Sequence, residues 1–310
     1  RDLGHGGGTI GRTIGGAVGA FLAASGQEVT FIARGAHLEA MREHGLTVHS
    51  GIKGDFVVEH PKAVTAGEYR ETPDVAFVCV KGYSLDDAAE LLARCAGPET
   101  VVIPLLNIFG TGSELQRRLP SAHVLDGCIY ITSYINAPGE ISQGGKLFRI
   151  VFGERDGSVS PKLEAIAAEL EHAGIRVVLS KEIRRDCFTK YALISVMAAV
   201  GAYYDVPMDE ISADPEKREM AAELSREIDA IASAMGIPFS KDIVAGNLKM
   251  IDTSPKGTTA SMQKDLKKGG KSEIDGLVFE PVRLGAQYQV ATPAFAKAAA
   301  KFGFTLAQKD

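Results

Sequence analysis

A run of glycines near the start of the chain has the spacing needed to hold a phosphate. Gly6, Gly8 and Gly11 satisfy the pattern GxGxxG within the sequence GGGTIG. The first glycine permits a tight turn, the second lets the backbone approach a pyrophosphate, and the third allows a helix to pack closely on a strand. The helix that follows directs free N–H groups at the anion. The segment therefore predicts a dinucleotide site that includes Gly6, Gly8, Thr9, Ile10 and Gly11.

The register of this loop has two solutions. The segment 1–5 is short and polar for a first buried strand. A helix over 11–26 is about one turn longer than a dinucleotide-binding βαβ unit needs. A turn around 11–15 fits the helix length better. It puts Arg12 at the position of the second glycine, however, where a side chain is sterically unfavourable. We therefore keep the first register.

The residue after the second predicted strand indicates which dinucleotide is bound. The strand predicted over 28–33 is followed by Arg34. NAD enzymes normally place Asp or Glu here, where the carboxylate binds the ribose hydroxyls. An arginine instead pairs with a 2′-phosphate through charge-assisted hydrogen bonds. The sequence thus predicts NADPH as the cofactor, with a solvated arginine at a strand end as the alternative interpretation.

The elements that must position these residues alternate between strands and helices. Short β-rich runs with helical stretches between them occur at 28–33, 74–80 and 101–106, and further β-rich pieces follow at 124–132 and 147–152. The first three are nearly continuous in apolar residues, which suits strands buried on both faces of a parallel sheet. Ser160 and Pro161 then begin a helix that runs to about His172. The fold class is therefore α/β, with an N-terminal Rossmann-type doubly wound sheet.

After about residue 180 the pattern becomes helical. Ser180 is placed to cap a helix that runs through Lys190 to Tyr204, and Asp214 begins another that stops at Gly236. Helical patterns continue at 243–251, 259–268, 272–286 and 293–302. A chain of 310 residues commonly divides into two domains. We expect an NADP-binding domain at 1–180 and an all-helical substrate and catalytic domain at 181–310.

Composition argues against several other classes of protein. The formal net charge of -5 gives no support to a nucleic-acid partner or a basic membrane-surface role. The cysteines are far apart and the histidines show no ligand spacing, so we expect reduced thiols and no metal. The longest apolar run, 191–204, is too short to span a bilayer, and the first residues show no signal peptide. We expect a cytoplasmic protein. A homodimer is compatible with the sequence, which does not define the oligomeric state.

Five local patterns, taken in their order along the chain, resemble the ketopantoate reductase (2-dehydropantoate 2-reductase) family. They are GGGTIG, ARGAHLEAM around Arg34, CVK ending at Lys81, LLN ending at Asn107, and Lys190 together with SMQKD…SEID from Ser261. The resemblance covers nearly the whole chain. It implies hydride transfer from NADPH to the 2-oxo carbon of ketopantoate, which gives the 2-hydroxy acid pantoate.

The resemblance also implies roles for five residues. Lys190 matches the family's general acid, which would protonate the developing alkoxide, and an ammonium group suits that chemistry. Asn107 matches an asparagine between nicotinamide and substrate, and Lys81 matches a lysine on the cofactor side. Ser261 matches a residue that holds the substrate carboxylate, and Glu273 one that holds a hydroxyl. Without the resemblance, all five are ordinary turn, helix or surface residues.

Three positions depart from the family pattern. Ile194 and Ala198 stand four and eight residues after Lys190, where members that reduce ketopantoate usually carry asparagines, and Ser195 is the nearest polar candidate. Ile108 follows Asn107 where the family has glycine, and a branched side chain there could change how closely the loop approaches the nicotinamide. These departures favour a more apolar 2-oxo acid as an alternative substrate.

Three functions are compatible with the sequence. The first is an NADPH-dependent reductase of a small 2-oxo acid, with ketopantoate as the leading substrate. The second is a related oxidoreduction on a different 2-oxo acid. The third is a non-catalytic sensor that binds NADP(H). Lys190, Asn107 and Glu273 together argue against the sensor, because binding a cofactor alone requires no general acid.

Overall fold

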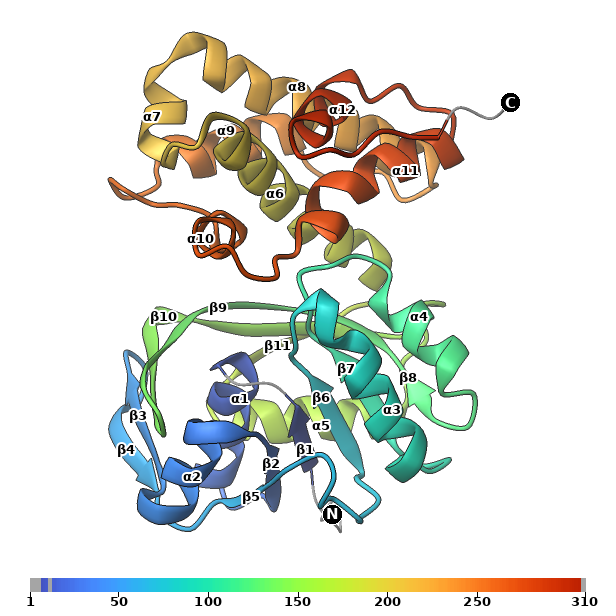
Figure 1. The fold of residues 1–310 in the computed structure, drawn as a ribbon. Coiled ribbons are helices and arrows are strands. Elements are labelled where there is room, and N and C mark those ends of the chain that lie inside the picture. Colours follow the sequence, from blue (N-terminus) through green and yellow to red (C-terminus); the bar gives the residue numbers. More distant parts are fainter. Residues whose placement is uncertain (1–6, 11–12, 308–310) are drawn as a thin grey trace. The chain divides into compact units, whose positions relative to one another are not determined.

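Two compact units make up the chain. A computed structural model describes residues 7–10 and 13–307, and its fold is drawn in Figure 1. Unit 1 comprises Arg1–Leu106 and Gly110–Ile183, and unit 2 comprises Asn107–Phe109 and Arg184–Asp310. The short piece Asn107–Phe109 belongs to unit 2 by its contacts, although unit 1 surrounds it in the sequence. The sequence prediction contained no such exchange.

Unit 1 is built on a six-stranded parallel sheet in the order β5-β2-β1-β6-β7-β8. Its strands are β1 (Gly7–Ile10), β2 (Val29–Ile32), β5 (Lys62–Val64), β6 (Val75–Val78), β7 (Val101–Pro104) and β8 (His123–Val124). The chain builds outward from β1 through β2 to β5, then returns and builds outward from β6 on the other side of β1. This is the doubly wound arrangement of dinucleotide-binding sheets, and the predicted fold class is confirmed.

Helices cover both faces of this sheet. On one face, Phe21 of α1 (Thr13–Ala24) packs in one cluster with Phe77 and Ile103 of the strands. On the other face, α3 (Leu85–Cys95) and α4 (Thr111–Arg118) pack over the next residues along the same strands. Because both faces are covered, the strands read as continuous apolar runs, which is why β2, β6 and β7 occur where the sequence predicts them.

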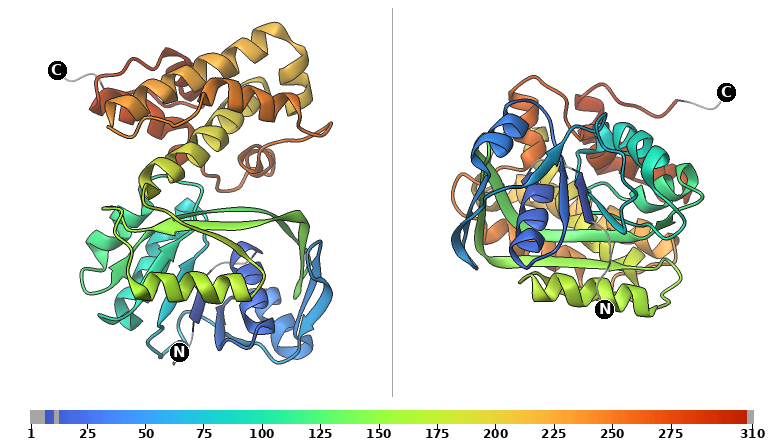
Figure 2. Two further views of the ribbon diagram at one scale, coloured as in Figure 1. Left: turned by 180° about the vertical axis from the view of Figure 1, so that it is seen from behind. Right: turned by 90° about the horizontal axis from the view of Figure 1, so that it is seen from below.

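A second sheet packs on α1, so that this helix contacts strands of both sheets. It has the order β11-β10-β3-β4, with β9 paired to β10. Its strands are β3 (Leu46–Ser50), β4 (Gly54–Val58), β9 (Asp126–Ala137), β10 (Glu140–Gly153) and β11 (Arg176–Leu179). The hairpin β9–β10, green in Figure 1 and visible from behind in Figure 2, brings Phe148 to 4.8 Å from Phe21 between ring centroids.

The starts of two further helices of unit 1 are explained by the residues at their N-termini. α5 (Pro161–His172) starts at the predicted cap, because the Ser160 hydroxyl accepts a hydrogen bond from Leu163 N at 3.3 Å. α2 (Gly35–His44) follows β2 directly, and Gly35 has a positive φ of 64°. The backbone therefore turns sharply just after Arg34, and a side chain at position 35 would be strained there.

The glycine-rich segment differs from the sequence prediction. Gly7–Ile10 forms the central strand β1, in register with β2 on one side and β6 on the other. Gly8, Thr9 and Ile10 are therefore strand residues, and their predicted place in the phosphate-binding loop is wrong. The physical reason is that a central strand must satisfy hydrogen bonds on both edges, and α1 begins only three residues later, at Thr13.

β1 ends at Ile10 and α1 begins at Thr13, and these bounds favour the register with the turn around 11–15. That register was set aside because of the side chain of Arg12. Gly6 and Gly11, the other predicted loop glycines, lie outside the described residues, as does Arg12.

Unit 2 is helical over its described residues. Its helices are α6 (Ile183–Tyr204), α7 (Met208–Ala213), α8 (Pro215–Ala234), α9 (Ile243–Asp252), α10 (Ser261–Lys267), α11 (Glu280–Gln287) and α12 (Pro293–Lys301). α8 begins at the predicted cap, where the Asp214 carboxylate accepts from the N–H groups of Glu216 and Lys217. α6 carries the apolar run 191–204 into the core. None of the described helices is long and apolar enough to cross a membrane.

The helix predicted over 272–286 is interrupted. It contains a π-helix, Asp275–Phe279, before α11 begins at Glu280. Pro281 provides a physical reason, because proline has no N–H to donate to the carbonyls of the preceding turn.

Candidate functional site

Two cationic side chains follow strands at the carboxyl edge of the parallel sheet in unit 1. Arg34 comes two residues after β2, and Lys81 comes three residues after β6. These strands flank β1, so the two residues lie on either side of the position where the strand order reverses. In doubly wound sheets, ligands bind outside the carboxyl ends of the strands at this position. The sheet therefore places both predicted cofactor residues at the expected edge.

Arg34 is available to bind an anion. It is exposed, its backbone is extended, and within the described residues its side chain forms no hydrogen bond or ion pair. Lys81 is half-buried and precedes a short turn, Gly82–Ser84. A guanidinium without an internal partner can bind a phosphate without first breaking an ion pair.

Other reactive groups in unit 1 do not add chemistry to this edge. Cys79 follows β6 closely, and burial raises the pKa of its thiol to about 12, so it stays protonated and is a poor nucleophile. The cysteines are free, as the sequence predicts. Across 7–10 and 13–307, no group of three or more His, Cys, Asp or Glu side chains could hold a metal ion.

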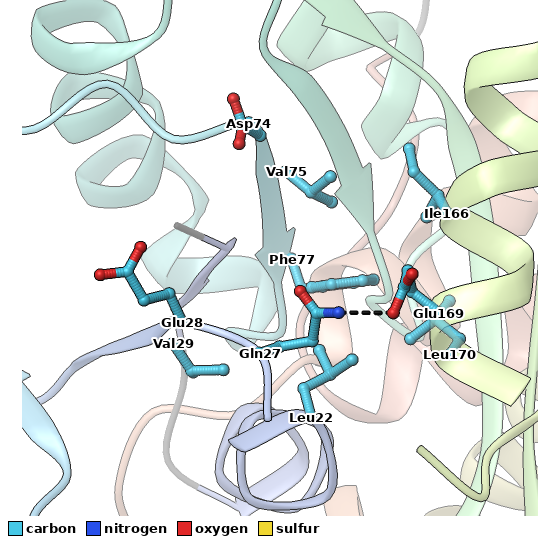
Figure 3. Close-up of a pocket in the computed structure, with 10 residues that line it drawn as sticks. All are labelled: Leu22, Gln27, Glu28, Val29, Asp74, Val75, Phe77, Ile166, Glu169 and Leu170. Atoms are coloured by element: carbon cyan, nitrogen blue, oxygen red, sulfur yellow. Dashed lines mark hydrogen bonds between the residues drawn. The ribbon is translucent and has the colours of Figure 1, made fainter. Parts of the chain in front are cut away.

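A small cavity lies at the opposite edge of the sheet, at the amino ends of β2 and β6 (Figure 3). Its volume is about 40 Å³, and apolar side chains such as Leu22 and Phe77 line much of it. Gln27 closes one side by donating a hydrogen bond to Glu169 of α5. Ligand pockets usually measure several hundred Å³, so this cavity is too small for a dinucleotide or an organic acid.

In unit 2 the structure brings two predicted site residues into direct contact. Lys190 lies in the first half of α6, and its Nζ donates a hydrogen bond to Asn107 Oδ1 at 3.1 Å. Both residues are half-buried. The side-chain amide thus fixes the position of the ammonium group within unit 2.

Glu273, another predicted site residue, lies just before the π-helix Asp275–Phe279, which packs on α6. Its side chain is 5% exposed. The Tyr191 hydroxyl donates to the carbonyl of Gly276 at 2.6 Å, and the Ser195 hydroxyl donates to that of Leu277 at 2.6 Å. The chain that follows Glu273 is therefore fixed to α6 at the turns that follow Lys190.

Proline chemistry explains these two bonds. In a regular or π-type helix, the carbonyls of Gly276 and Leu277 would have Pro281 N as a partner, and Pro281 has no hydrogen to give. Hydroxyls from α6 occupy these acceptors instead. Burial raises the pKa of Tyr191 well above its usual range, so the phenol keeps the proton that it donates.

Two residues that follow Lys190 in α6, Ser195 and Ala198, are buried. Ser195 is fully buried and its hydroxyl is used by Leu277, so it is not a substitute for the missing amides. Ala198 is also fully buried and belongs to the core of unit 2. Ala198 therefore has no exposed surface with which to line a pocket. Position 198 is two turns beyond Lys190, where the rotation per residue has carried the side chain into the core.

Ser261 stands apart from this network. It is the first residue of α10 and is exposed, and its hydroxyl bonds no other described residue. α10 itself is held near the C-terminal end of α6, because Gln263 Nε2 donates to Val206 O at 3.2 Å. No hydrogen bond joins Ser261 to Lys190 or Glu273.

Sequence reasoning did not single out Tyr191, Gly276 or Pro281. A signal for them exists in retrospect. Gly276 and Pro281 are five residues apart inside a predicted helix, and each weakens a regular α-helix there. Tyr191 directly follows the predicted general acid.

A doubly wound sheet with cationic residues at its carboxyl edge, followed by a helical unit with a lysine–asparagine pair, defines a two-domain dinucleotide-dependent oxidoreductase. Comparisons with known families agree. The profile of the family described as ketopantoate reductase PanE/ApbA matches residues 8–157, and the profile of its C-terminal domain matches residues 182–301. The chain belongs to the ketopantoate reductase family, whose members reduce 2-oxo acids with a nicotinamide cofactor.

Individual relatives resemble the chain over most of its length. An oxidoreductase of Bacillus subtilis named YkpB is 28% identical over 85% of this chain and 86% of its own. The 2-dehydropantoate 2-reductase of Archaeoglobus fulgidus is 28% identical over 89% of both chains. The crystal structure of 2-dehydropantoate 2-reductase from Methylococcus capsulatus superposes with a TM-score of 0.85 at 26% identity, covering 96% of each chain.

Proposed function

We propose that the protein reduces a small 2-oxo acid to the 2-hydroxy acid with NADPH, that Lys190 is the general acid, and that ketopantoate is the first candidate substrate. The observation that carries this proposal is the hydrogen bond of 3.1 Å between Lys190 Nζ and Asn107 Oδ1. A sensor that only binds a dinucleotide has no need for an ammonium group held in this way. The names of the relatives, 2-dehydropantoate 2-reductases, support the substrate class.

The residues of unit 1 fit a dinucleotide with a 2′-phosphate. Arg34 is exposed without an internal ion pair, at the end of the strand where the ribose is bound in this fold. Lys81 lies across β1 from it and supplies a second positive charge. The connection from β1 to α1 would hold the pyrophosphate at the N-terminus of α1. When bound, the nicotinamide supplies the hydride.

Lys190 then completes the reaction. Reduction of the 2-oxo carbon places negative charge on its oxygen, and the Lys190 ammonium both stabilises that charge and donates the proton. Asn107 accepts one ammonium N–H, which restricts rotation of the group and directs the others. We assign Glu273 to a hydroxyl of the substrate and Ser261 to its carboxylate. The free, exposed hydroxyl of Ser261 is compatible with this role.

A second candidate substrate follows from the surface of α6. Beyond Lys190 along α6, the half-exposed residues that share its face are Leu193, Ile194 and Met197, all of them apolar. Ketopantoate carries a hydroxyl that an amide at position 194 could bind, and isoleucine offers it no partner. A 2-oxo acid with an alkyl or aryl side chain would instead bury apolar surface against this face.

Steady-state oxidation of NADPH tests both candidates. Ketopantoate is compared with 2-oxo acids that carry branched alkyl or phenyl side chains, at equal concentrations. The highest kcat/KM for ketopantoate supports the first candidate, and the highest value for an alkyl or aryl acid supports the second. Tight NADPH binding without turnover of any acid would refute the enzyme and favour the sensor.

A substitution sharpens the choice between substrates. Ile194→Asn should raise the ratio of kcat/KM for ketopantoate to that for an alkyl acid about tenfold, since one hydrogen bond is worth about 1 kcal/mol or more. Met250→Asn is the matched control, because Met250 is 50% exposed and lies on a different helix, α9. An equal ratio in both variants contradicts a substrate contact at Ile194.

A further inference from the structure

The segment Asn107–Phe109 is held in unit 2 at both of its ends. Asn107 accepts the hydrogen bond from Lys190. The ring of Phe109 lies 4.8 Å from that of Phe188 and 6.0 Å from that of Tyr191, measured between centroids. Both rings belong to α6, on either side of Lys190 in the sequence. The segment therefore lies along the same stretch of helix that carries the proposed general acid.

The middle residue of this segment interlocks with the π-helix. The side chain of Ile108 occupies the space next to Gly276, where a β-carbon would overlap Ile108 Cδ1 and lie 3.1 Å from Cγ1 and Cγ2. A β-carbon at position 276 therefore fits only if the side chain of Ile108 moves. The absence of a side chain at Gly276 thus leaves the space that the side chain of Ile108 fills.

These contacts close a ring around the proposed catalytic pair. Lys190 bonds Asn107, Asn107 is joined to Ile108, Ile108 packs on Gly276, and the carbonyl of Gly276 accepts from Tyr191, which follows Lys190. A shift of Gly276 relative to Ile108 must therefore move either the amide of Asn107 or the turn of α6 that carries Lys190.

We propose that Ile108 and Gly276 are positioning residues, and that their interlock holds the Asn107 amide against Lys190 Nζ. This inference rests on the proposed function, in which that pair supplies the proton. A β-branched residue at 108 has few side-chain conformations and less backbone freedom than glycine. Asn107 is therefore ordered before substrate arrives, and no ordering cost is left for the reaction step.

The first test adds a methyl group at position 276 and measures the effect on kcat. In Gly276→Ala the new methyl group must displace Ile108, and kcat should fall about 10- to 100-fold because misplacement by about 1 Å can cost that much. The Kd for NADPH should change less than twofold. Shortening the opposing side chain should relieve the overlap, so the double variant Gly276→Ala with Ile108→Val should recover about tenfold of the lost kcat.

Gly246→Ala is the matched control. Gly246 lies in α9, and a β-carbon there meets nothing within 4 Å, so this variant should keep the wild-type kcat. Far-ultraviolet circular dichroism and thermal unfolding establish that each variant is folded. If Gly276→Ala misfolds, the double variant and Ile108→Gly carry the test, and Ile108→Gly should lower kcat about tenfold. Unchanged kcat in Gly276→Ala, or no recovery in the double variant, overturns the proposal.

The second test needs no turnover. The chain has no tryptophan, so Phe109→Trp introduces a single fluorescent reporter into the segment. The indole should emit as a buried group in the parent and shift to longer wavelength, with stronger acrylamide quenching, once Gly276→Ala is added. Adding Ile108→Val should restore the parent emission.

The two tests separate the inference from the function on which it rests. The expected fluorescence shifts in a protein that reduces no 2-oxo acid would establish the interlock and refute the proposed function. Turnover without any fluorescence shift in the Gly276→Ala variant would support the proposed function and overturn the interlock.

Discussion

The cationic side chains of the two units are positioned in different ways. Arg34 in unit 1 is exposed and bonds no other described side chain, and the sheet alone brings it to the carboxyl edge. Lys190 in unit 2 is half-buried and bonded to Asn107, and the surrounding turns are tied together through Tyr191 and Gly276. Backbone topology suffices to place a charge for binding. Lys190, which as the proposed general acid would have to meet a reacting atom, is held by side-chain contacts as well.

This difference predicts how substitutions spread. At Arg34, a change should affect only the ligand group that touches the guanidinium. In the network of unit 2, a change at a residue that touches no ligand, such as Gly276, should still reach the reaction. The predictions below test this contrast, starting with the largest effect.

Removing the proposed general acid should have the largest effect. Lys190→Ala should lower kcat about 10²- to 10⁴-fold, the usual contribution of a positioned acid, and should change the Kd for NADPH less than threefold. Single-turnover kinetics and equilibrium NADPH titration measure the two quantities. Lys249→Ala, an exposed lysine on α9, is the control and should leave both unchanged. Equal losses of turnover and binding in Lys190→Ala would show that the residue is structural.

Removing the predicted phosphate ligand should alter selectivity. Arg34→Ala should raise the Kd for NADPH about 10- to 100-fold, because a hydrogen bond to a charged group contributes about 1.5–3 kcal/mol. The Kd for NADH should change little, since NADH has no 2′-phosphate. The same titration with Arg70→Ala, at an exposed site beyond β5, supplies the control. An unchanged ratio of the two dissociation constants would remove the argument for NADPH.

Local signals made much of the fold predictable. β2, β6 and β7 are buried apolar runs, and α5 and α8 begin at a Ser-Pro and an Asp-Pro cap, so their positions depend on neighbouring residues alone. β3 and β4 were not predicted. They pair with each other and, through β3, with β10, a strand far away in the sequence. β4 is largely exposed, so its apolar pattern is weak.

The candidate site was less accessible to sequence reasoning. The resemblance to a family named Lys190 and Asn107, but their contact joins residues 83 positions apart and no local pattern encodes it. The glycine pattern was read in the wrong register, because three glycines in GxGxxG spacing outweighed the polar character of residues 1–5. The interlock of Ile108 with Gly276 depends on shape, which only the folded chain displays.

A buried carboxylate in unit 2 should make stability depend on pH. Glu227 of α8 is 9% exposed and accepts from Ala294 N at 2.5 Å and Phe295 N at 3.0 Å, at the start of α12. Burial raises its pKa to about 7, although the two N–H donors oppose the shift. The folded state then holds this proton more tightly than the unfolded chain does. Stability should fall as pH rises from about 4.5 to 7, by about 3 kcal/mol at most.

Glu227→Gln should abolish this slope, because the amide has no proton to lose in that range. Urea unfolding at several pH values between 5 and 8 measures it. Glu210→Gln, at an exposed position on α7, should keep the wild-type slope. The opposite result would be a wild-type protein whose stability rises toward pH 7 while that of Glu227→Gln does not. It would mean that the folded state favours the ionised carboxylate.

The smallest predicted effect is a shift in unfolding temperature, and it tests whether the two units unfold separately. Ser160→Ala removes the cap of α5 in unit 1, and Asp214→Ala removes the cap of α8 in unit 2, at about 1 kcal/mol each. The buried clusters of unit 1 share no residue with that of unit 2, so we expect two calorimetric transitions. Each variant should lower one transition by about 2 to 4 °C and leave the other in place.

Ser160→Thr and Asp214→Asn retain an acceptor at each cap and should recover most of the loss. Bound NADPH gives an independent assignment, since it should raise most the transition that Ser160→Ala lowers. If both cap variants lower a single transition by the same amount, the chain unfolds as one cooperative body. The contrast between the units would then apply to how charges are placed and not to how the units are stabilised.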